Sequence, residues 1–466
     1  MIDASTSAGR AIAAYDRYPA LEEIQDTARA LAARHPRLCR TRTVGRSRAG
    51  RPLTLLSVGD AADHVLVVCG AHPDELVGGA AAMELAHRVL ADPAQRASVA
   101  WDFLLCADPD GARLVHGAHR ARDLEGFLAH YFRPASDEQP EWAPSIGGQL
   151  PESDILLGLI GELRPFLQFS LHGIDVGGTF VQSTREIPGL AGPFTRSAAE
   201  FGIPVECGSY DTVLYAEQAP GVYLMPPPAP DAPPAPGAAR TNGTSAADIR
   251  GTTWYAPHRH GGATVIVEAA RWACDRMSDG SPGRDPQRRL AACADRMRRR
   301  GDLIAALLDD APARLPGPGG RRGSGAEGDG DGPLVRSVRS QLGFLRRLPD
   351  DWDPRCGGPG PVPAGRRLTE GVLAGLEQWT HRVPLRAAAM LRRAVAPAGP
   401  PAAPLTARLD MLLHDWTARY RSTFPATRLP VARQAGHQAG VVQAAVALSR
   451  PGSLPAAAGE CAADTP

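Results

Sequence analysis

Two residues with metal-binding side chains lie close together in the stretch CGAHPDELVGG, which spans residues 69–79. His72 and Glu75 are separated by only two residues, and they follow the apolar run HVLVV. Imidazole and carboxylate groups are zinc ligands, and a turn after a buried strand of an α/β sheet is a usual place for a site. An ordinary polar loop gives the same local pattern, so both interpretations stay open on this stretch alone.

Polar side chains also lie near the ends of other apolar runs. His172 follows FLQFSL, Asp108 and Asp110 follow DFLLCA, and Glu268 lies within ATVIVEAA. The carboxyl ends of parallel strands meet at one edge of an α/β sheet, where sites collect. We therefore expect some of these residues to share a site at that edge.

A catalytic zinc takes three protein ligands, leaves one position for water and needs a base beside that water. His72, Glu75 and His172 complete a His–Glu–His set, called here the zinc ligand set. The alternative for His172 is a buried structural histidine, and a lone HxxE pair occurs by chance in a chain with 13 His. The three residues together predict a zinc site.

Glu268 is the candidate base. Its carboxylate interrupts an otherwise apolar strand. Such a group must be paired, protonated or functional, because burying an unpaired charge costs several kcal/mol. The alternative is a structural ion pair with Arg271 or Arg259.

The elements that must position these residues alternate between strands and helices. Apolar runs bounded by Gly predict buried strands, and apolar residues at helical spacing predict helices. The expected strands are 51–59, 64–70, 99–107, 166–173, 179–183 and 263–270, and the expected helices are 18–36, 78–90 and 153–165. This alternation predicts an α/β fold with a mixed, largely parallel sheet flanked by helices.

Two segments interrupt this pattern. A Pro-rich insert is predicted at 226–248, and a Gly-rich linker at 316–334. The linker would separate an α/β domain at 1–315 from a mainly helical region at 335–450, and the tail at 451–466 is predicted to be disordered. Because no candidate site residue lies beyond the linker, we expect the C-terminal region to be separable from the chemistry.

Composition excludes several classes of function. The net charge of the 466 residues is +1, so no strong field favours nucleic acid or an anionic membrane. All basic residues are Arg, which excludes a Schiff-base lysine and a P-loop. The eight scattered Cys predict reduced thiols. No leader and no membrane span are indicated, which predicts a cytoplasmic location, and nothing indicates an oligomeric state.

The motifs, taken in order, resemble those of the zinc carboxypeptidases, the carboxypeptidase A-like family. The opening helix and the stretch VGRSRAGRPLTLLSVG are similar to that family's opening helix and hairpin. GAHPDE resembles its HxxE zinc motif, and DPDG resembles its NPDG turn. FSLHG resembles the strand that carries its second zinc His, and ATVIVEAA resembles the strand that carries its catalytic Glu. The resemblance covers residues 18–310.

The resemblance implies a Zn²⁺-dependent hydrolase that cleaves an amide bond, as a metallocarboxypeptidase acting at a peptide C-terminus. Zn²⁺ would lie in the zinc ligand set, and Glu268 would be the general base for a zinc-activated water. Asp74 or Asp175 would accept a hydrogen bond from a zinc-bound imidazole.

The chain departs from the family where the substrate carboxylate is bound. The family uses an Asn–Arg pair, and the corresponding stretch here, GFLAHYFRP, has Ala129 and His130 in those places. Imidazole does not reproduce the bidentate geometry of a guanidinium. His130 and the nearby Arg133 are the candidate substrate-binding residues.

Three further roles come only from the resemblance. The family's oxyanion-stabilising Arg would match Arg120 or Arg122. Of these two, Arg122 is predicted to be catalytic and Arg120 to bind substrate. Tyr255, or less directly Tyr223, would stand for the family's mobile Tyr near the catalytic Glu. The alternatives are solvated surface arginines and tyrosines of the core or rim.

The altered carboxylate site leaves two other functions open. One is a deacylase acting on a small N-acyl amino acid or on a specialised biosynthetic peptide. The other is a non-catalytic binding protein on the same fold, against which the complete zinc ligand set and Glu268 argue. The expected partner in the catalytic cases is a peptide or N-acyl amino acid.

Overall fold

The computed structural model describes residues 16–228, 249–311, 331–357, 360–362 and 366–450. Most of the predicted Pro-rich insert, most of the predicted Gly-rich linker and the whole predicted tail lie outside these described residues.

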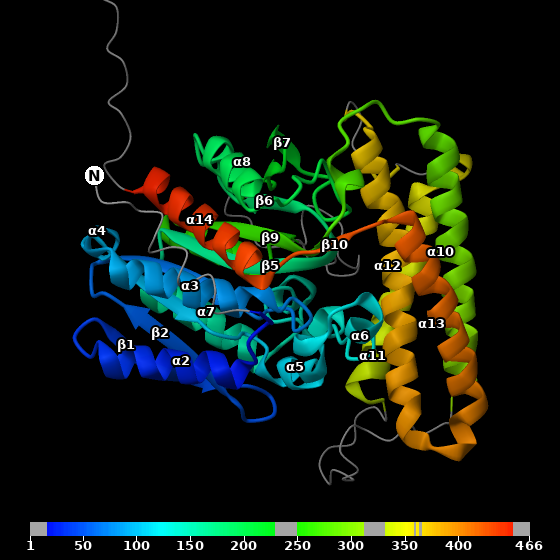
Figure 1. The fold of residues 1–466 in the computed structure, drawn as a ribbon, viewed down its shortest axis with the longest axis horizontal. Coiled ribbons are helices and arrows are strands. Elements are labelled where there is room, and N and C mark those ends of the chain that lie inside the picture. Colours follow the sequence, from blue (N-terminus) through cyan, green and yellow to red (C-terminus); the bar gives the residue numbers. More distant parts are fainter. Residues whose placement is uncertain (1–15, 229–248, 312–330, 358–359, 363–365, 451–466) are drawn as a thin grey trace, which may run out of the picture.

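A mixed sheet of ten strands lies at the centre of the described chain (Figure 1). The strands are β1 (Cys39–Arg46), β2 (Pro52–Val58), β3 (Asp63–Cys69), β4 (Val99–Leu104), β5 (Leu167–Gly177), β6 (Thr179–Ser183), β7 (Ala216–Ala219), β8 (Val222–Leu224), β9 (Ala263–Ala273) and β10 (Thr427–Arg428). Their order is β1-β2-β4-β3-β5-β9-β6-β8-β7, and β10 pairs with β9. The central strands β4, β3, β5 and β9 run parallel to one another, whereas the β1–β2 and β7–β8 pairs towards the edges are antiparallel.

Helices flank this sheet, which confirms the predicted fold class. They are α2 (Leu21–Arg34), α3 (Val77–Ala91), α4 (Pro93–Arg96), α5 (Pro109–Leu114), α6 (Leu124–Leu128), α7 (Pro151–Leu163), α8 (Ala191–Glu200), α10 (Pro286–Asp309), α11 (Pro333–Trp352), α12 (Glu370–Val395), α13 (Ala403–Thr423) and α14 (Val431–Ser449). The four long helices α10 to α13 stand side by side at one end of the sheet (Figure 1).

The alternation of side chains along β3 explains how two layers of helices form. Val65 and Val67 point into a core shared with α2, α3, α8 and α14, whereas Leu66 and Val68 point into a core shared with α7. Side chains of a strand alternate between the faces of its sheet, so a strand that is apolar throughout must be covered on both. The continuous apolar run therefore requires helices on each face.

The C-terminal helices are joined to the sheet across the predicted linker. Helix α10, which precedes the linker, packs against α11 and α12, and α14, which follows it, packs against α3 and β9. Thr427 of β10 pairs with Ala273 of β9. These contacts argue against a separable C-terminal region. The domain boundaries themselves stay a prediction.

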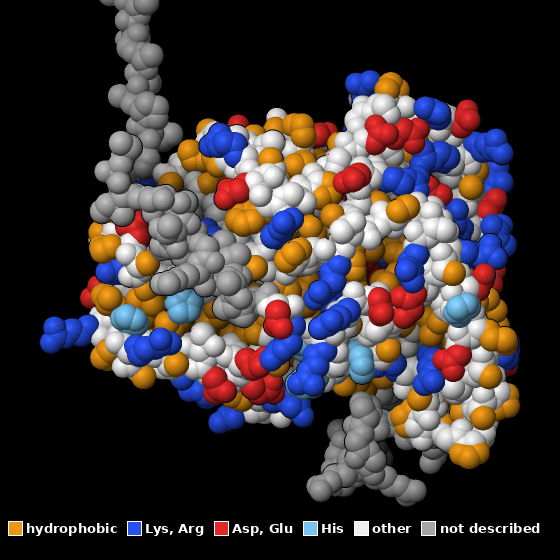
Figure 2. Space-filling view, in the orientation of Figure 1, with side chains coloured by type: hydrophobic (Ala, Val, Ile, Leu, Met, Phe, Trp, Pro, Cys, Tyr) orange, Lys and Arg blue, Asp and Glu red, His pale blue; other side chains and the backbone are white. Residues whose placement is uncertain are grey.

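The surface carries both signs of charge. Figure 2 shows basic and acidic side chains interspersed over one face of the molecule, which agrees with the net charge of +1. Over the described residues, none of the helices combines the length and apolar character of a membrane span. The seven cysteines among those residues are free thiols, as predicted.

Gln438 of α14 ties the C-terminal end of the chain to the central strands. Its side-chain amide donates to the carbonyl oxygens of His172, at 2.6 Å, and Val267, at 2.9 Å. We predict that Gln438→Ala lowers the free energy of unfolding by about 1–3 kcal/mol, because two buried hydrogen bonds are lost. Urea denaturation followed by circular dichroism measures this change.

The matched control is Gln443→Ala on the same helix, whose side chain is only partly buried. A change within about 0.5 kcal/mol is expected there. Equal losses in the two variants would contradict the role given to Gln438.

Candidate metal centre

The turn after β3 carries the first two predicted ligands. Gly70 adopts φ +60°, the left-handed region that favours glycine, and a Cβ there would meet the Sγ of Cys106 at 2.9 Å. The Glu75 N–H then donates to the His72 carbonyl oxygen at 3.1 Å. This tight turn brings the Nδ1 of His72 and the Oε1 of Glu75 to 3.1 Å from each other.

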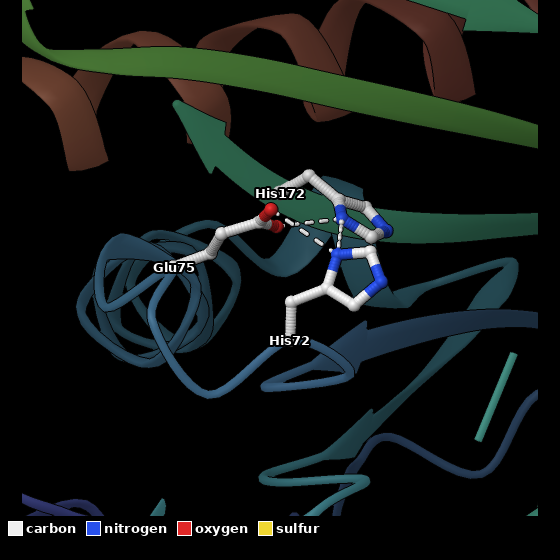
Figure 3. Close-up of side chains that lie close together, drawn as sticks. All are labelled: His72, Glu75 and His172. Carbon is white, nitrogen blue, oxygen red and sulfur yellow. Dashed lines mark hydrogen bonds and ion pairs between the residues drawn. The ribbon is translucent and has the colours of Figure 1, made fainter. Parts of the chain in front are cut away.

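His172 reaches the same point from β5 (Figure 3). Its Nδ1 lies 2.7 Å from the Oε2 of Glu75 and 3.1 Å from the Nδ1 of His72. The three ligand atoms all lie within 4.8 Å of one another. The structure therefore brings the whole predicted zinc ligand set together, and two imidazoles with one carboxylate are a donor set that Zn²⁺ takes.

The outer nitrogens of both imidazoles meet acceptors. The Oε1 of Gln139 lies 3.0 Å from the Nε2 of His72, and the amide of Gln139 is oriented by its own bond to the Pro134 carbonyl oxygen at 2.9 Å. The Oε2 of Glu141 lies 2.9 Å from the Nε2 of His172. Acceptors at Nε2 hold the proton there and leave the Nδ1 lone pairs for a cation.

Gln139 and Glu141 replace the acceptors expected from sequence. Asp74 pairs instead with Arg133, at 2.9 Å, and Asp175 pairs with Arg386, at 3.2 Å. Sequence reasoning missed Gln139 and Glu141 because their loop has no periodic pattern and adjoins no apolar run. Only its path across the sheet edge brings them to the imidazoles.

Charges within the cluster oppose the effect of burial. Burial favours neutral Glu75, but the charges of His72, Arg133 and His172 outweigh it and hold the pKa of Glu75 well below its ordinary value. Burial likewise favours neutral His172, yet Glu75 and Glu141 raise the pKa of His172 well above its usual range. Zinc binds imidazole in its neutral form, so binding of a cation and protonation of His172 compete.

Glu268 lies beside the cluster. In the parallel register of β5 and β9, Glu268 is paired with His172, and both side chains line the same cavity. The Oε2 of Glu268 is buried and has no hydrogen-bond partner among the described residues. Burial, followed by the negative charge of Glu75, raises the pKa of Glu268 well above its ordinary value.

The structural alternative for Glu268 is not observed. None of the ion pairs within the described ranges includes Glu268, and Arg259 is exposed. The guanidinium of Arg271 donates to the carbonyl oxygens of Ala118 and Ala121, both at 2.9 Å. Within the part of the chain that the structure describes, no cationic side chain pairs with the carboxyl group of Glu268 at the cavity.

A cavity of about 310 Å³ lies beside these residues. Its walls come from the sheet edge, from the loops before α7 and after α8, and from the helices α11 and α12. Besides the zinc ligand set and Glu268, its lining includes Arg133, Gln139, Trp142, Tyr210, Tyr215, Trp254, Ser340, Gln341, Phe344, Trp379, Arg382 and Arg386. The C-terminal region expected to be separable therefore supplies part of the wall.

Arg133 is the predicted substrate-binding residue that the structure brings to the cavity. Its guanidinium donates to the Oε1 of Glu75 at 2.5 Å and pairs with Asp74 at 2.9 Å. The side chain of Arg133 thus holds in place the turn that carries His72 and Glu75.

Arg120, Arg122 and His130 do not reach the site. All three side chains are exposed, and none lines the cavity. Their segment turns its polar side chains to solvent, while its apolar residues, such as Phe127, enter the core. The geometry gives no support to the roles transferred from the family's motif.

The two candidate tyrosines also lie elsewhere. The hydroxyl of Tyr255 donates to the Pro226 carbonyl oxygen at 2.6 Å, and that of Tyr223 to the Glu206 carbonyl oxygen at 3.1 Å. Tyr210 and Tyr215 line the cavity instead. No sequence signal distinguished them.

Asp108 and Asp110 support the fold. Asp108 caps α5 by accepting the Gly111 N–H at 2.8 Å, and burial raises its pKa to about 7. Asp110 pairs with Arg51 at 2.6 Å. Neither aspartate lines the cavity.

Comparison with protein families finds one match in the N-terminal part of the chain. Residues 24–125 match the family model described as zinc carboxypeptidase, and this segment contains His72 and Glu75. This match confirms the resemblance predicted from the motifs, and it covers about a fifth of the chain.

Solved structures show similarity at low identity. A metallo-carboxypeptidase from Burkholderia cenocepacia is 17% identical in sequence, with a TM-score of 0.36. The alignment spans 53% of this chain and 59% of the Burkholderia protein. Carboxypeptidase A from Helicoverpa armigera is 16% identical, with a TM-score of 0.33. That alignment spans 55% of this chain and 65% of the Helicoverpa protein. Bovine thrombin-activatable fibrinolysis inhibitor is 15% identical, with a TM-score of 0.29. Here the alignment spans 40% of this chain and 71% of the bovine protein.

This chain thus covers less than two thirds of the Burkholderia and Helicoverpa proteins. Because these TM-scores lie below 0.5, the resemblance to zinc carboxypeptidases rests on the sequence match of residues 24–125. No curated protein matches the sequence.

The zinc ligand set gives a direct prediction of metal content. We expect about one zinc per chain, and its loss in His72→Ala and in His172→Ala, because each variant removes one of three ligands. Elemental analysis of the purified proteins measures the content. His414→Ala, which changes an exposed histidine, is the control and should keep its zinc. Equal zinc in all four proteins would refute the assignment.

Glu141 gives a second prediction. Glu141→Gln keeps the shape of the side chain but removes the charge that orients His172, so zinc affinity should fall by about 10- to 100-fold. Competition with a chelator of known affinity measures this loss. The control is Glu138→Gln, at a carboxylate that pairs with Arg336 at 2.7 Å. An unchanged affinity in Glu141→Gln would exclude the orienting role.

Proposed function

We propose that this chain is a zinc-dependent hydrolase that cleaves amide bonds, and that it acts as a metallocarboxypeptidase at a peptide C-terminus. The observation that carries the proposal is the convergence of the zinc ligand set and unpaired Glu268 at one sheet edge beside a cavity. The zinc carboxypeptidase match of residues 24–125 supports it.

Each residue of the site has a chemical task in this proposal. Zn²⁺ held by the zinc ligand set would supply a Lewis acid that acidifies water and polarises a carbonyl group. Glu268 accepts the proton of the attacking water and returns it to the leaving amine. Burial and the charge of Glu75 raise the pKa of the Glu268 carboxyl group, which favours the return of the proton to the amine. Arg133 positions Glu75 through their ion pair.

A second candidate function is a deacylase acting on small N-acyl amino acids. One observation favours it: the cavity, about 310 Å³, lies at the small end of the range for ligand sites, which begins at about 300 Å³. Side chains of α11 and α12, such as Phe344 and Trp379, form part of its wall.

A substrate panel separates the two candidates. The zinc-loaded protein is assayed for amine release from N-acylated peptides of increasing length and from N-acyl amino acids. A metallocarboxypeptidase cleaves the last residue from all the peptides, whereas a deacylase of small substrates loses activity as the acyl part grows. No turnover on any member by the zinc-loaded protein would contradict both candidates.

Glu268→Gln tests the assignment of the base. The variant keeps the shape of the side chain while removing the proton acceptor, so we expect a folded, zinc-loaded protein whose kcat falls by about 100-fold or more. Melting temperature, zinc content and rate are measured on one substrate.

Glu206→Gln is the matched control. Glu206 is also a buried acid, with its pKa raised to about 7 by burial, but it does not line the cavity. This variant should keep its kcat. A stable, zinc-loaded Glu268→Gln variant with unchanged kcat would rule out the mechanism.

A further inference from the structure

Helix α12 presents a buried guanidinium to the cavity at Arg382. The side chain of Arg382 is 9% exposed, and it lines the same cavity as Glu268. Its nearest carboxylate oxygens, on Asp175 and Asp211, both lie at 3.7 Å, which is beyond hydrogen-bond distance. Its Nε has no hydrogen-bond partner among the described residues. Buried donors left unused cost free energy, so a ligand that accepts from them is favoured.

The other two arginines at the cavity are already engaged. Arg133 donates to Glu75 at 2.5 Å. Arg386 lies 3.2 Å from Asp175, and its guanidinium stacks over the ring of Tyr131 with 4.8 Å to the ring centroid. Among these three guanidinium groups, that of Arg382 therefore has donors to offer to a substrate.

The surroundings of Arg382 strengthen its attraction for an anion. Trp379 lies three residues earlier on α12, so it shares a helix face with Arg382. Its ring lies 4.4 Å from that of Tyr210 and 6.4 Å from that of Phe344, measured between centroids. An aromatic wall lowers the local dielectric constant, and a charge pair beside it is stronger than one in water.

The weak ion pair with Asp211 does not block this role. The side chain of Asp211 is 41% exposed, so water solvates its carboxylate when the pair opens. Only Arg382 of this pair is buried, and the 3.7 Å separation is too long for a hydrogen bond. Displacing Asp211 from Arg382 is therefore inexpensive.

We propose that Arg382 binds the carboxylate of the substrate, in the role left empty by Ala129 and His130, and that it selects amides with a free carboxylate next to the cleaved bond. The planar guanidinium matches the two oxygens of a carboxylate. The proposal rests on the proposed amide hydrolysis. Because α12 lies outside residues 24–125, this recognition comes from a part of the chain beyond the family match.

Binding in a Glu268→Gln background tests this role without turnover. The full chain is loaded with zinc, and isothermal titration calorimetry measures binding of N-acetyl-glycyl-phenylalanine and of its C-terminal amide. With Arg382 intact, the acid should bind more tightly than the amide. Arg382→Ala should weaken binding of the acid by about 10-fold or more, and binding of the amide by less than about 2-fold, because only the acid loses a charge-assisted hydrogen bond.

Two further variants make the result specific. Arg392→Ala on the same helix removes an arginine that pairs with Asp410 at 2.8 Å away from the cavity, and it should bind both probes unchanged. Arg382→Lys keeps the charge but loses the bidentate geometry, so it should retain part of the preference for the acid. It also keeps the test open if the alanine variant does not fold. With Glu268 restored, Arg382→Lys should raise KM for acid substrates more than it lowers kcat.

Several outcomes would overturn the proposal. With Arg382 intact, equal affinity for the acid and the amide, or no binding of the acid, would contradict it. In Arg382→Ala, an equal loss of affinity for both probes, or no loss of affinity for either probe, would also contradict it. Failure of the proposed hydrolysis gives a different result: the zinc-loaded wild-type protein turns over no substrate, while the binding preference for the acid and its dependence on Arg382 persist.

Discussion

The parallel register of β3, β5 and β9 is the constraint on which the site depends. Register pairs His172 with Glu268, and the common direction of the strands brings the turn after β3 to the same edge. Side chains alternate along a strand, so a slip of one residue would turn His172 or Glu268 to the opposite face. Gln438 reinforces this register, because its amide bonds to backbone carbonyls of both β5 and β9.

Alternating charges connect this edge to the helical bundle. Asp74 lies between Arg133 and Arg386, and Asp175 lies between Arg386 and Arg382. Buried charges are stable when they are paired, and removing one partner leaves the other uncompensated. The turn that bears Glu75 and the helix α12 therefore depend on each other. Truncation of the chain before α11 would remove Arg382 and Arg386, and with them the partners that these two aspartates have on α12.

The cavity combines two sources of structure. The sheet edge, which continues from the segment matching the zinc carboxypeptidases, supplies the groups suited to chemistry. Helices α11 and α12 supply much of the opposite wall, including Phe344, Trp379 and Arg382. Under the proposed function, the sheet edge would hold the reacting groups and the helices would select the substrate. The stretch GFLAHYFRP lacks an Asn–Arg pair, whereas three other guanidinium groups, those of Arg133, Arg382 and Arg386, line the cavity.

The fold class and the four residues that meet at the sheet edge could be predicted from local sequence patterns. His72, Glu75, His172 and Glu268 each adjoin or interrupt an apolar run, and a strand fixes the direction of side chains within a few residues. Tertiary structure alone decided that Gln139 and Glu141 meet the imidazoles, that Arg382 enters the cavity, and that Arg120, Arg122 and His130 face solvent. These positions depend on contacts between irregular loops and helices that are far apart in the sequence. Local periodicity does not predict such long-range packing.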